Sequence, residues 1–465
     1  MTQSSVPDRY CIIGAGASGL AVAKNFKQRG IPFDCLERAS DIGGLWNIET
    51  PYGTVYETTH LVSSISSTGY DDFPMEDADY PEYPNHRLVL GYFRKYAHKF
   101  GIEPHIELGK TVTSVTPSGD KVWSVTVAGE PEPRLYRGVV LANGHHDVPR
   151  MPTYPGTFNG TILHSRDYRH PRQLRDRRVL VVGAGNSACD VASDAIHGGS
   201  EVFFSWRRGY WFVPKFMLGF PTHDVVSFVE HLPLPRFMKR QIFRASLWLL
   251  QGPPSRYRLP DPDYAIDQAH PTMSDEIPRL AAHGRLTVKA EIDRYDSNRV
   301  IFKDGSAETI DTIVFATGYR ISLPFIDNSL IFAPDGRPKL HLSMIDTEHD
   351  GLYAAGLVQA NGSMWRIADY QGQIISNLIV AEQQAPEIAA RYLDGARNTV
   401  PARRRSFVAS DRHTLEANYY EYRALLRKQL RAFRQVLKLT YRPRDGMKKM
   451  PAAAEPAAPS KANAA

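Results

Sequence analysis

The feature that most constrains this chain is a glycine-rich turn that occurs twice, each time between a short apolar segment and a helical pattern. The first turn, after residues 10–13, is Gly14-Ala15-Gly16-Ala17-Ser18-Gly19. The second turn, after residues 179–182, is Gly183-Ala184-Gly185-Asn186-Ser187-Ala188. A strand, a tight glycine turn and a helix in this order are typical of the unit that binds a dinucleotide at the helix N-terminus.

Both turns are followed by the same series of elements. We expect helices that end near residues 29 and 196, second strands over 33–38 and 201–206, turn-rich hairpins, and closing apolar strands over 138–141 and 312–315. The closing strands run into small residues, Asn143-Gly144 in the first copy and Thr317-Gly318 in the second. This matching order predicts an α/β protein with two Rossmann-like dinucleotide-binding domains.

An acid at the end of the second strand predicts the ligand of the first copy. Gly14 permits the sharp turn, Gly16 lets the backbone approach a pyrophosphate, and Gly19 lets helix and strand pack closely. Glu37 would accept hydrogen bonds from an adenosine ribose with free hydroxyl groups. We therefore predict FAD as the first cofactor.

The second copy has no acid at the corresponding position. Its second strand runs into Arg207 and Arg208, and guanidinium groups pair with phosphate, often through two hydrogen bonds. Because a carboxylate would repel a ribose 2′-phosphate, we predict NADPH rather than NADH as the second cofactor. Two dinucleotide sites in one chain imply hydride transfer between two cofactors.

The composition excludes several other classes of protein. The 465 residues are 42% hydrophobic and 23% charged, as in globular proteins, and the net charge of +6 is a mild surplus. Cys11, Cys35 and Cys189 lack the spacing of a disulfide framework or a zinc site, so we expect no metal. No segment resembles a nucleic-acid module, and no run of about 18 uncharged apolar residues could span a bilayer. Because residues 1–10 contain no apolar leader, we expect a cytoplasmic protein.

The C-terminal part predicts one long basic helix over residues 413–440. Apolar residues recur there at steps of three and four, with arginines and lysines between them. They are Leu415, Tyr419, Tyr422, Leu426, Leu430, Phe433 and Leu437. Such a helix either packs on its own protein or lies on an anionic membrane, and the two tyrosines favour packing.

These features predict a division of the chain in which the second domain is inserted in the first. The FAD-binding domain would comprise residues 1–170 and 306–400, and the NADPH-binding domain residues 171–305, with an insertion at 209–275 over the active-site cleft. Residues 401–445 would hold the basic amphipathic helix. Residues 446–465, rich in alanine and proline, would form a disordered tail.

Three motifs carry a family resemblance that covers about residues 8–385. Residues 158–168 read FNGTILHSRDY and resemble the FxGxxxHxxx(Y/F) fingerprint of the flavin-containing monooxygenases. Gly44, Leu45 and Trp46 are similar to the end of their flavin-contacting GGxW turn, and residues 315–319 resemble their ATGY motif. The related Baeyer–Villiger monooxygenases have a fingerprint that ends in Trp-Pro or Trp-Asp, which differs from the Tyr168-Arg169 found here.

The resemblance implies a reaction. NADPH reduces FAD, the reduced flavin and O2 form a C4a-hydroperoxide, and a soft nitrogen or sulfur nucleophile attacks its distal oxygen while NADP+ stays bound. Because the cofactor carries the chemistry and the protein supplies placement and water exclusion, no catalytic triad is expected. The partners would be a small-molecule substrate and O2, and a homodimer is one open form of assembly.

One departure from the family pattern concerns the residues after His60. Many family members have an asparagine there that hydrogen-bonds near the flavin peroxide, whereas this chain has serines. The resemblance therefore points to Ser63 or Ser64 as a substitute hydroxyl, and to leakage of hydrogen peroxide if neither serves. We interpret His164 of the fingerprint as a structural hydrogen-bonding residue rather than a proton relay.

Other functions remain open from the sequence. The same peroxide could oxygenate a ketone, as in Baeyer–Villiger enzymes. The two dinucleotide sites alone would also suit a disulfide or quinone reductase, although Cys11 and Cys35 do not form the CxxxxC pair of a disulfide reductase. A redox-sensing flavoprotein without turnover is the alternative outside enzymes. The substrate itself is not readable from the sequence.

Overall fold

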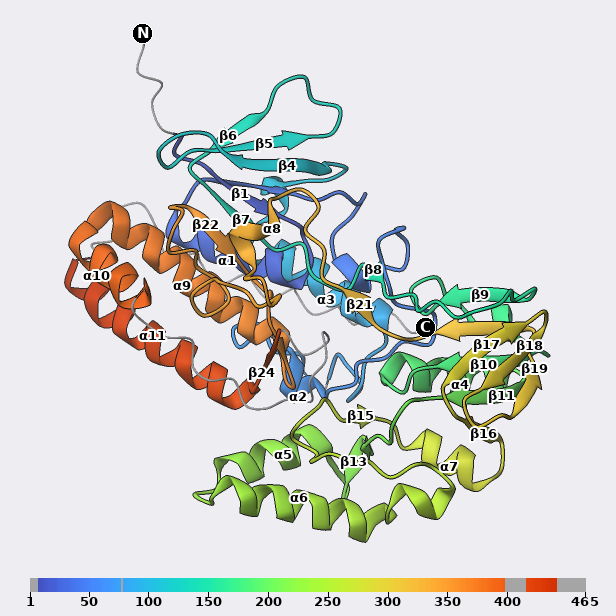
Figure 1. Cartoon of the computed structure of the whole chain (residues 1–465). Helices are drawn as coiled ribbons and strands as arrows, with labels where there is room; N and C mark the ends of the chain where they lie inside the picture. The colour runs from blue at the N-terminus through green and yellow to red at the C-terminus, as the bar shows by residue number, and fades with distance from the viewer. Residues whose placement is uncertain (1–6, 77, 398–414, 441–465) are drawn as a thin grey trace, which may run out of the picture.

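Two parallel β-sheets form the two lobes of the molecule in the computed structural model, which describes residues 7–76, 78–397 and 415–440 (Figure 1). The first sheet has the strand order β22 (Leu352–Ala354), β7 (Gly138–Leu141), β1 (Tyr10–Ile13), β2 (Phe33–Leu36) and β3 (Ile106–Glu107). The second has the order β16 (Leu286–Lys289), β11 (Glu201–Ser205), β10 (Arg178–Val182), β20 (Thr312–Phe315) and β9 (Thr161–His164). The predicted α/β class with two parallel sheets is confirmed.

The two sheets repeat one topology. In each, a helix connects the central strand to its neighbour: α1 (Ala17–Arg29) leads from β1 to β2, and α4 (Asn186–His197) leads from β10 to β11. The closing strand then pairs in parallel on the other side, β7 with β1 and β20 with β10. The two glycine-rich turns follow β1 and β10. They therefore lie at the carboxyl ends of the parallel strands, where ligands bind in such sheets.

A three-stranded antiparallel sheet precedes each closing strand. The two sheets consist of β4 (Val112–Pro117), β5 (Trp123–Val127) and β6 (Arg134–Tyr136), and of β17 (Ile292–Asp296), β18 (Arg299–Phe302) and β19 (Ala307–Thr309). The hairpins expected in both copies are thus present. The repeat extends through the whole order of elements and not only through the glycine turns.

The strand pairings correct two of the expected domain boundaries. β9 lies within residues 1–170 and β20 within residues 306–400, yet both belong to the second sheet, where they pair with each other. The chain returns to the first sheet only at β22. The error has a physical reason: β20 is the counterpart of β7 and therefore needs β10 as its neighbour, while β9 completes the exposed edge of that sheet.

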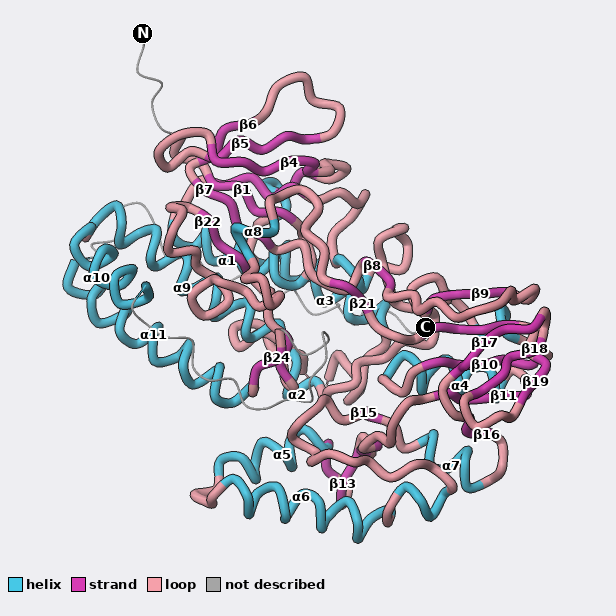
Figure 2. Tube along the Cα trace, viewed as in Figure 1, coloured by secondary structure: helices cyan, strands magenta, loops and turns pink. Residues whose placement is uncertain are grey.

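Residues 209–275 form a mainly helical unit beside the second sheet (Figures 1 and 2). Its elements are β12 (Phe212–Val213), β13 (Phe216–Met217), β14 (Phe220–Pro221), α5 (Thr222–His231), α6 (Arg236–Gln251) and β15 (Thr272–Met273). β12 and β15 pair in parallel and bring the two ends of the unit together. α7 (Glu276–Ala282) then leads back into the second sheet.

Three helices cover the other side of the molecule: α9 (Met364–Gln384), α10 (Pro386–Arg397) and α11 (Tyr419–Thr440). α9 packs along α1, with Leu20 and Phe26 in one apolar core with Ile375 and Leu378. Within the described ranges, the helices are all too short or too polar to cross a membrane.

The basic helix begins at Tyr419 rather than at residue 413, because Glu416 and Ala417 form β24, which pairs with β23 (Gln359–Ala360). The expected apolar stripe is buried from Leu415 through Phe433, as packing on the protein requires. Leu437 and the parts of the division that fall on residues 398–414 and 441–465 lie outside the described side chains.

Candidate functional site: two dinucleotide cradles and a shared cavity

The first glycine-rich turn is held by contacts that only glycine allows. Gly14 has φ +100°, and a Cβ added to it would lie 2.8 Å from the carbonyl oxygen of Ala142. A Cβ on Gly19 would lie 1.8 Å from the carbonyl oxygen of Gly14. α1 therefore begins directly against β1, and the N–H groups of its first turn have no acceptor within the helix. These free donors and the helix dipole fit a pyrophosphate.

Glu37 fastens this turn to the end of β2. Its side chain is buried, and its two oxygens accept hydrogen bonds from the N–H groups of Ala15, at 2.7 Å, and Ala39, at 2.8 Å. A carboxylate oxygen can accept more than one hydrogen bond, so these contacts are compatible with the predicted role toward a ribose. They also give Glu37 a structural role that the sequence did not predict.

The GGxW-like segment packs directly against the first turn. It forms the 3₁₀ turn η1 (Gly44–Trp46), and the N–H of Gly43 donates to the carbonyl oxygen of Ala15 at 3.1 Å. A Cβ on Gly44 would lie 3.1 Å from the Cα of Gly16. Leu45 accepts backbone hydrogen bonds from residues 54 and 55, and the ring of Trp46 meets the ring of Trp365 edge to face. Two glycine-rich backbones thus face each other at the predicted flavin site.

A third glycine at this site was missed in the sequence. Gly356 follows β22 with φ +78°, and a Cβ there would lie 2.3 Å from Oγ of Ser18. Its N–H donates to Oε1 of Gln371 on α9 at 2.8 Å. Asn143 and Gly144, after the closing strand β7, line a small cavity with Gly356. The signal was available, because residues 352–356 read as a short strand that runs into small residues and a glycine, like the two closing strands.

The second glycine-rich turn has the geometry of the first. Gly183 has φ +119°, and its Cβ would lie 2.5 Å from the carbonyl oxygen of Ala316, the counterpart of Ala142. α4 begins with a hydrogen bond from Cys189 N–H to Gly185 oxygen at 3.1 Å, as α1 begins with Leu20 to Gly16 at 3.0 Å. Ala188 occupies the place of Gly19 and is fully buried. The second turn therefore offers the same cradle for a pyrophosphate.

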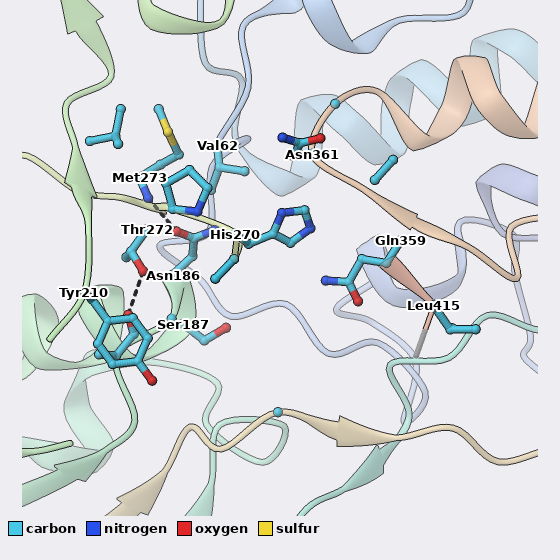
Figure 3. Close-up of a pocket in the computed structure, with 18 of the residues that line it drawn as sticks. Val62, Asn186, Ser187, Tyr210, His270, Thr272, Met273, Gln359, Asn361 and Leu415 are labelled. Carbon is cyan, nitrogen blue, oxygen red and sulfur yellow. Dashed lines mark hydrogen bonds between the residues drawn. The ribbon is translucent and has the colours of Figure 1, made fainter. Parts of the chain in front are cut away.

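The helical insertion is hydrogen-bonded to this second turn. The hydroxyl of Thr272 donates to the carbonyl oxygen of Ala184 at 2.7 Å, and the N–H of Met273 donates to Oδ1 of Asn186 at 2.9 Å (Figure 3). Ser187 lines the cavity next to these contacts. The insertion thus fixes the side chain at the start of α4, which sequence reasoning did not anticipate.

The two arginines after β11 differ in their surroundings. Arg207 is exposed and lines the cavity. Arg208 also lines it, but its guanidinium group makes a bidentate pair with Asp263 of the insertion at 3.1 and 3.0 Å and lies over the ring of Tyr264. Arg207 is therefore the guanidinium better placed for a 2′-phosphate, whereas Arg208 would have to exchange its carboxylate partner.

The fingerprint segment is fixed to the end of the closing strand β20 through structural hydrogen bonds. Nδ1 of His164 accepts from the N–H of Arg166 and Nε2 faces the carbonyl oxygen of Gly318, both at 3.1 Å. This pattern fixes the neutral tautomer with the proton on Nε2, and removal from water lowers the pKa of the imidazole. Thr317 donates its hydroxyl proton to the carbonyl oxygen of Arg150. The structural interpretation of His164 is confirmed.

Two carboxylates of α4 accept hydrogen bonds from three hydroxyl groups outside that helix. The hydroxyl of Tyr56 donates to Asp190 at 2.5 Å, and Thr58 and Tyr168 donate to Asp194 at 2.6 and 2.8 Å. Tyr168 is the last residue of the fingerprint. Loss of hydration raises the pKa of Asp190 to about 6, even though the Tyr56 hydrogen bond and nearby cations favour its charged form. The two acids hold α4 against the segment that follows η1.

A cavity of about 2120 Å³ opens beside the second turn. Its wall combines that turn, the segments around β8 (Val148–Pro149) and β21 (Tyr319–Arg320), the insertion, and residues 359–366. His145 and His146 line it, and burial lowers the pKa of His145 to about 4, so its ring is neutral at pH 7. Figure 3 shows Asn186, His270 and Gln359, from three different regions, facing this space.

The structure separates the two serines that were predicted near the reacting oxygen. Ser63 lines the cavity, and its hydroxyl is 2.6 Å from that of Thr68. Ser64 is fully buried and bonds within the first turn of α2 (Ile65–Thr68), to Ser66 and Ser67. Ser64 is therefore not placed to act on a ligand in the cavity. Its hydroxyl is engaged by the hydroxyls of Ser66 and Ser67 on the turn that follows, which explains the difference.

Two observations limit the chemistry of the protein itself. Among the described residues, no cluster of three or more metal-ligating side chains occurs. The three cysteines are buried and unpaired, and burial raises the pKa of the Cys189 thiol. Burial also raises the pKa of the Cys11 and Cys35 thiols, so all three thiols stay protonated and are unsuited to nucleophilic attack.

Comparison with known proteins identifies relatives of the chain. Residues 7–450 match the family model described as flavin-binding monooxygenase-like. The chain is 30% identical over 439 residues to dimethylaniline monooxygenase (N-oxide-forming) 2 of Rattus norvegicus, covering 89% of this chain and 81% of that protein.

Solved structures with low sequence identity share the fold. S-allyl-L-cysteine S-oxygenase from Allium sativum superposes with a TM-score of 0.62 at 19% identity, covering 93% of each chain. Cyclohexanone monooxygenase in an open crystal structure gives a TM-score of 0.65 at 18% identity, covering 93% of this chain and 98% of that one. The two-lobed architecture is therefore shared with S-allyl-L-cysteine S-oxygenase and with cyclohexanone monooxygenase.

Proposed function

This chain belongs to the flavin-binding monooxygenase-like family, and on that premise we propose that it is an FAD-containing, NADPH- and O2-dependent monooxygenase that oxygenates a soft nitrogen or sulfur nucleophile. One observation carries the proposal. The same glycine cradle occurs twice, with a buried acid, Glu37, beside the first copy and an exposed base, Arg207, beside the second.

The first cradle fits a nucleotide that stays bound. The N–H groups at the start of α1 would bind the pyrophosphate of FAD, and Glu37 would orient its ribose. Gly44 and Gly356 pack against this turn, and the side chain of Gln371 holds the backbone of Gly356. Bound FAD supplies hydride acceptance and O2 activation, and the surrounding residues supply placement and exclusion of water.

The second cradle fits a nucleotide that exchanges. It opens on the large cavity, so NADPH could enter and NADP+ could leave. The N-terminus of α4 would bind the pyrophosphate and Arg207 the 2′-phosphate. Asn186 is held by Met273, so a ligand at this helix end would meet side chains of the insertion as well as of the second sheet.

The substrate would share the cavity with the nicotinamide end of this nucleotide. Ser63, His145 and Gln359 line that space, and none of them has to act as a nucleophile. Sulfur and nitrogen compounds are favoured over ketones because the fingerprint ends in Tyr168-Arg169. A reducing compartment such as the cytoplasm suits three unpaired cysteines.

The test is a substrate screen with the purified, FAD-loaded protein. NADPH consumption, O2 consumption, product and released hydrogen peroxide would be measured with a thioether, a tertiary amine and a cyclic ketone. We expect sulfoxide or N-oxide in proportion to NADPH. A lactone as the main product would replace the proposal by ketone oxygenation, and NADPH use that yields only hydrogen peroxide with all three would overturn it for these classes.

A further inference from the structure

The large cavity is lined by more basic than acidic side chains. Nine arginine and lysine side chains reach it, against six carboxylates. The insertion contributes three of these cations and four of the carboxylates, and it pairs Arg236 with Asp267 at 2.8 Å and Lys239 with Glu230 at 3.6 Å. The excess of positive charge therefore comes from the rest of the cavity wall.

One of these other cations, Arg423 on α11, lacks an acidic partner. It is partly buried and lines the cavity. Its guanidinium carbon lies 6.0 Å from the centroid of the Tyr419 ring, and its Nε donates a long hydrogen bond to the hydroxyl of Tyr370 at 3.5 Å. The nearby Asp71 pairs with Arg366 at 3.1 Å, and no carboxylate of the described residues lies within 4 Å of Arg423. A cation that has lost part of its water favours an anion beside it.

The start of α11 sets the position of Arg423. Tyr419 and Arg423 are one helical turn apart, and both line the cavity. The ring of Tyr419 packs on Gly362, where an added Cβ would lie 2.4 Å from it. The N–H of Tyr419 donates to Oδ1 of Asn361 at 3.3 Å. This contact leaves the NH2 group of Asn361, which also lines the cavity (Figure 3), as a donor for a ligand.

This part of the wall lies next to the predicted flavin site. Trp365 and Arg366 are consecutive residues in the first turn of α9. The buried Trp365 meets Trp46 of η1, whereas Arg366 lines the cavity. The guanidinium group of Arg366 donates to the carbonyl oxygens of Ser66 and Gly69 at 2.6 and 2.8 Å. Arg366 is therefore a second cation, fixed by the backbone, on the flavin side of the cavity.

The phosphates of the two nucleotides do not account for Arg423. We assign the pyrophosphates to the N-termini of α1 and α4 and the 2′-phosphate to Arg207. The second sheet, which leads into Arg207, lies on the opposite side of the molecule from α9 and α11 (Figure 1). The positive charge at Arg423 is therefore available to a third molecule in the cavity.

We propose that Arg423 binds a carboxylate of the substrate, with Asn361 as a further donor, so that the oxygenated nucleophile is an anionic thioether or amine. A guanidinium group matches a carboxylate through two parallel hydrogen bonds. A monoanion is favoured over a phosphate because Asp224 lies close by and would repel a second negative charge. Asp224 lines the cavity and accepts from the hydroxyls of Ser66 and Ser67 at 2.7 and 3.2 Å.

The assignment of a nucleophile rests on the proposed function, whereas carboxylate binding needs no turnover. In the reaction, the sulfur of a thioether would gain one atom of O2 and become a sulfoxide. The other oxygen atom would leave as water, which takes up a proton and the hydride equivalent of NADPH. The carboxylate would stay unchanged and serve only to hold the substrate.

A pair of substrates that differ in charge tests this proposal with the full-length, FAD-loaded protein. The pair is 3-(methylthio)propionate and 3-(methylthio)propanamide. We expect kcat/KM to be at least about tenfold higher for the carboxylate. Arg423→Gln should lower kcat/KM for the carboxylate about thirtyfold, as expected for a lost charge-assisted hydrogen bond, and leave the amide within about twofold. Arg423→Lys keeps the charge without the guanidinium fork and should give an intermediate value.

Matched measurements separate binding from loss of structure. Arg427→Gln removes an exposed cation one turn further along α11 and should leave the preference for the carboxylate unchanged. The melting temperature, the flavin content and the KM for NADPH of Arg423→Gln should stay close to those of the parent. Calorimetry with pentanoate, in which a methylene group replaces the sulfur, measures binding without turnover. Arg423→Gln should bind pentanoate about thirtyfold more weakly.

Two results would overturn the carboxylate site. The parent could oxygenate the amide as efficiently as the carboxylate, or Arg423→Gln could lower kcat/KM equally for both. Either result would leave the proposed monooxygenase reaction in place. Binding of pentanoate that depends on Arg423, without oxygenation of either thioether, would instead support the carboxylate site and contradict the proposed reaction.

Discussion

The two glycine-rich turns share one backbone and differ in what surrounds them. Gly14 and Gly183 both have strongly positive φ angles and both sit against the carbonyl oxygen of an alanine. The first turn contacts Glu37, Gly44 and Gly356, whereas residues of the second turn line the large cavity. Under the proposed function, this difference in surroundings suits a resident cofactor at the first turn and an exchanging one at the second.

The largest effect is expected from exchanging the sixth residue of the two turns, which is glycine in the first and alanine in the second. Gly19→Ala puts a methyl group 1.8 Å from the carbonyl oxygen of Gly14, so α1 must move away from β1. We expect a loss of about 3 kcal/mol, at the upper end for overpacking, and poor flavin retention. Ala188→Gly, at the matching position, should cost only about 1 kcal/mol. Urea unfolding and the flavin content are measured for both variants. Equal losses of unfolding free energy would show that the two positions are packed alike.

Glu37→Gln tests the role of the buried acid beside the first turn. The carboxylate accepts from two backbone N–H groups, and an amide offers one acceptor oxygen, so one N–H loses its partner. We expect a cost of about 1–3 kcal/mol, seen as a lower melting temperature and a smaller flavin-to-protein ratio. Glu308→Gln, at a partly exposed acid of the other lobe, is the control for loss of a carboxylate. Unchanged flavin retention would remove Glu37 from the proposed FAD site.

Arg207→Ala tests the open turn. Loss of a charge-assisted hydrogen bond to a phosphate costs about 2 kcal/mol, so the KM for NADPH should rise about thirtyfold while the KM for NADH stays nearly constant. Arg299→Ala, an exposed arginine on β18, serves as the matched control. Asp263→Asn frees Arg208 and should leave NADPH preferred. An equal rise for both nucleotides would contradict the assignment of Arg207.

The contact between the lobes should depend on pH through Asp190. Its pKa in the folded protein is raised to about 6, so the protonated form is favoured by folding, and the stability that it contributes is lost as the pH rises through about 6. The unfolding free energy of Asp190→Asn, minus that of the parent, should therefore increase by about 1 kcal/mol from pH 5 to pH 8. Tyr56→Phe keeps the carboxylate and should keep the pH dependence. A constant difference across this range would contradict the raised pKa.

Local patterns predicted most of the two repeats. β1 spans residues 10–13 as expected, and the strands that follow each helix end within two residues of their predicted limits, because apolar periodicity and glycine turns act within a few residues. The assignment of β9 and β20 to domains failed, since strand pairing joins residues far apart in the chain. The start of α11 at Tyr419 was missed for the same reason, because Glu416 and Ala417 pair with β23.

The candidate site was predicted where a motif carried it. The glycine turns, Glu37 and the two arginines lie at the ends of their strands as expected, and Arg207 faces the cavity. Gln371 and Asp263 were not found, because each acts through a partner from another element. Ser64 was proposed only on its position after His60, whereas in the structure it is buried and its hydroxyl bonds to those of Ser66 and Ser67.

Anaerobic addition of NADPH to the purified protein shows whether one chain holds both FAD and a site from which NADPH reduces it. We expect a yellow protein with one FAD per chain that loses its colour within the time of turnover and regains it when O2 is admitted. NADH should reduce the flavin far more slowly than NADPH does. A protein that is colourless and takes up no FAD, or a bound flavin that NADPH does not reduce, would contradict the account.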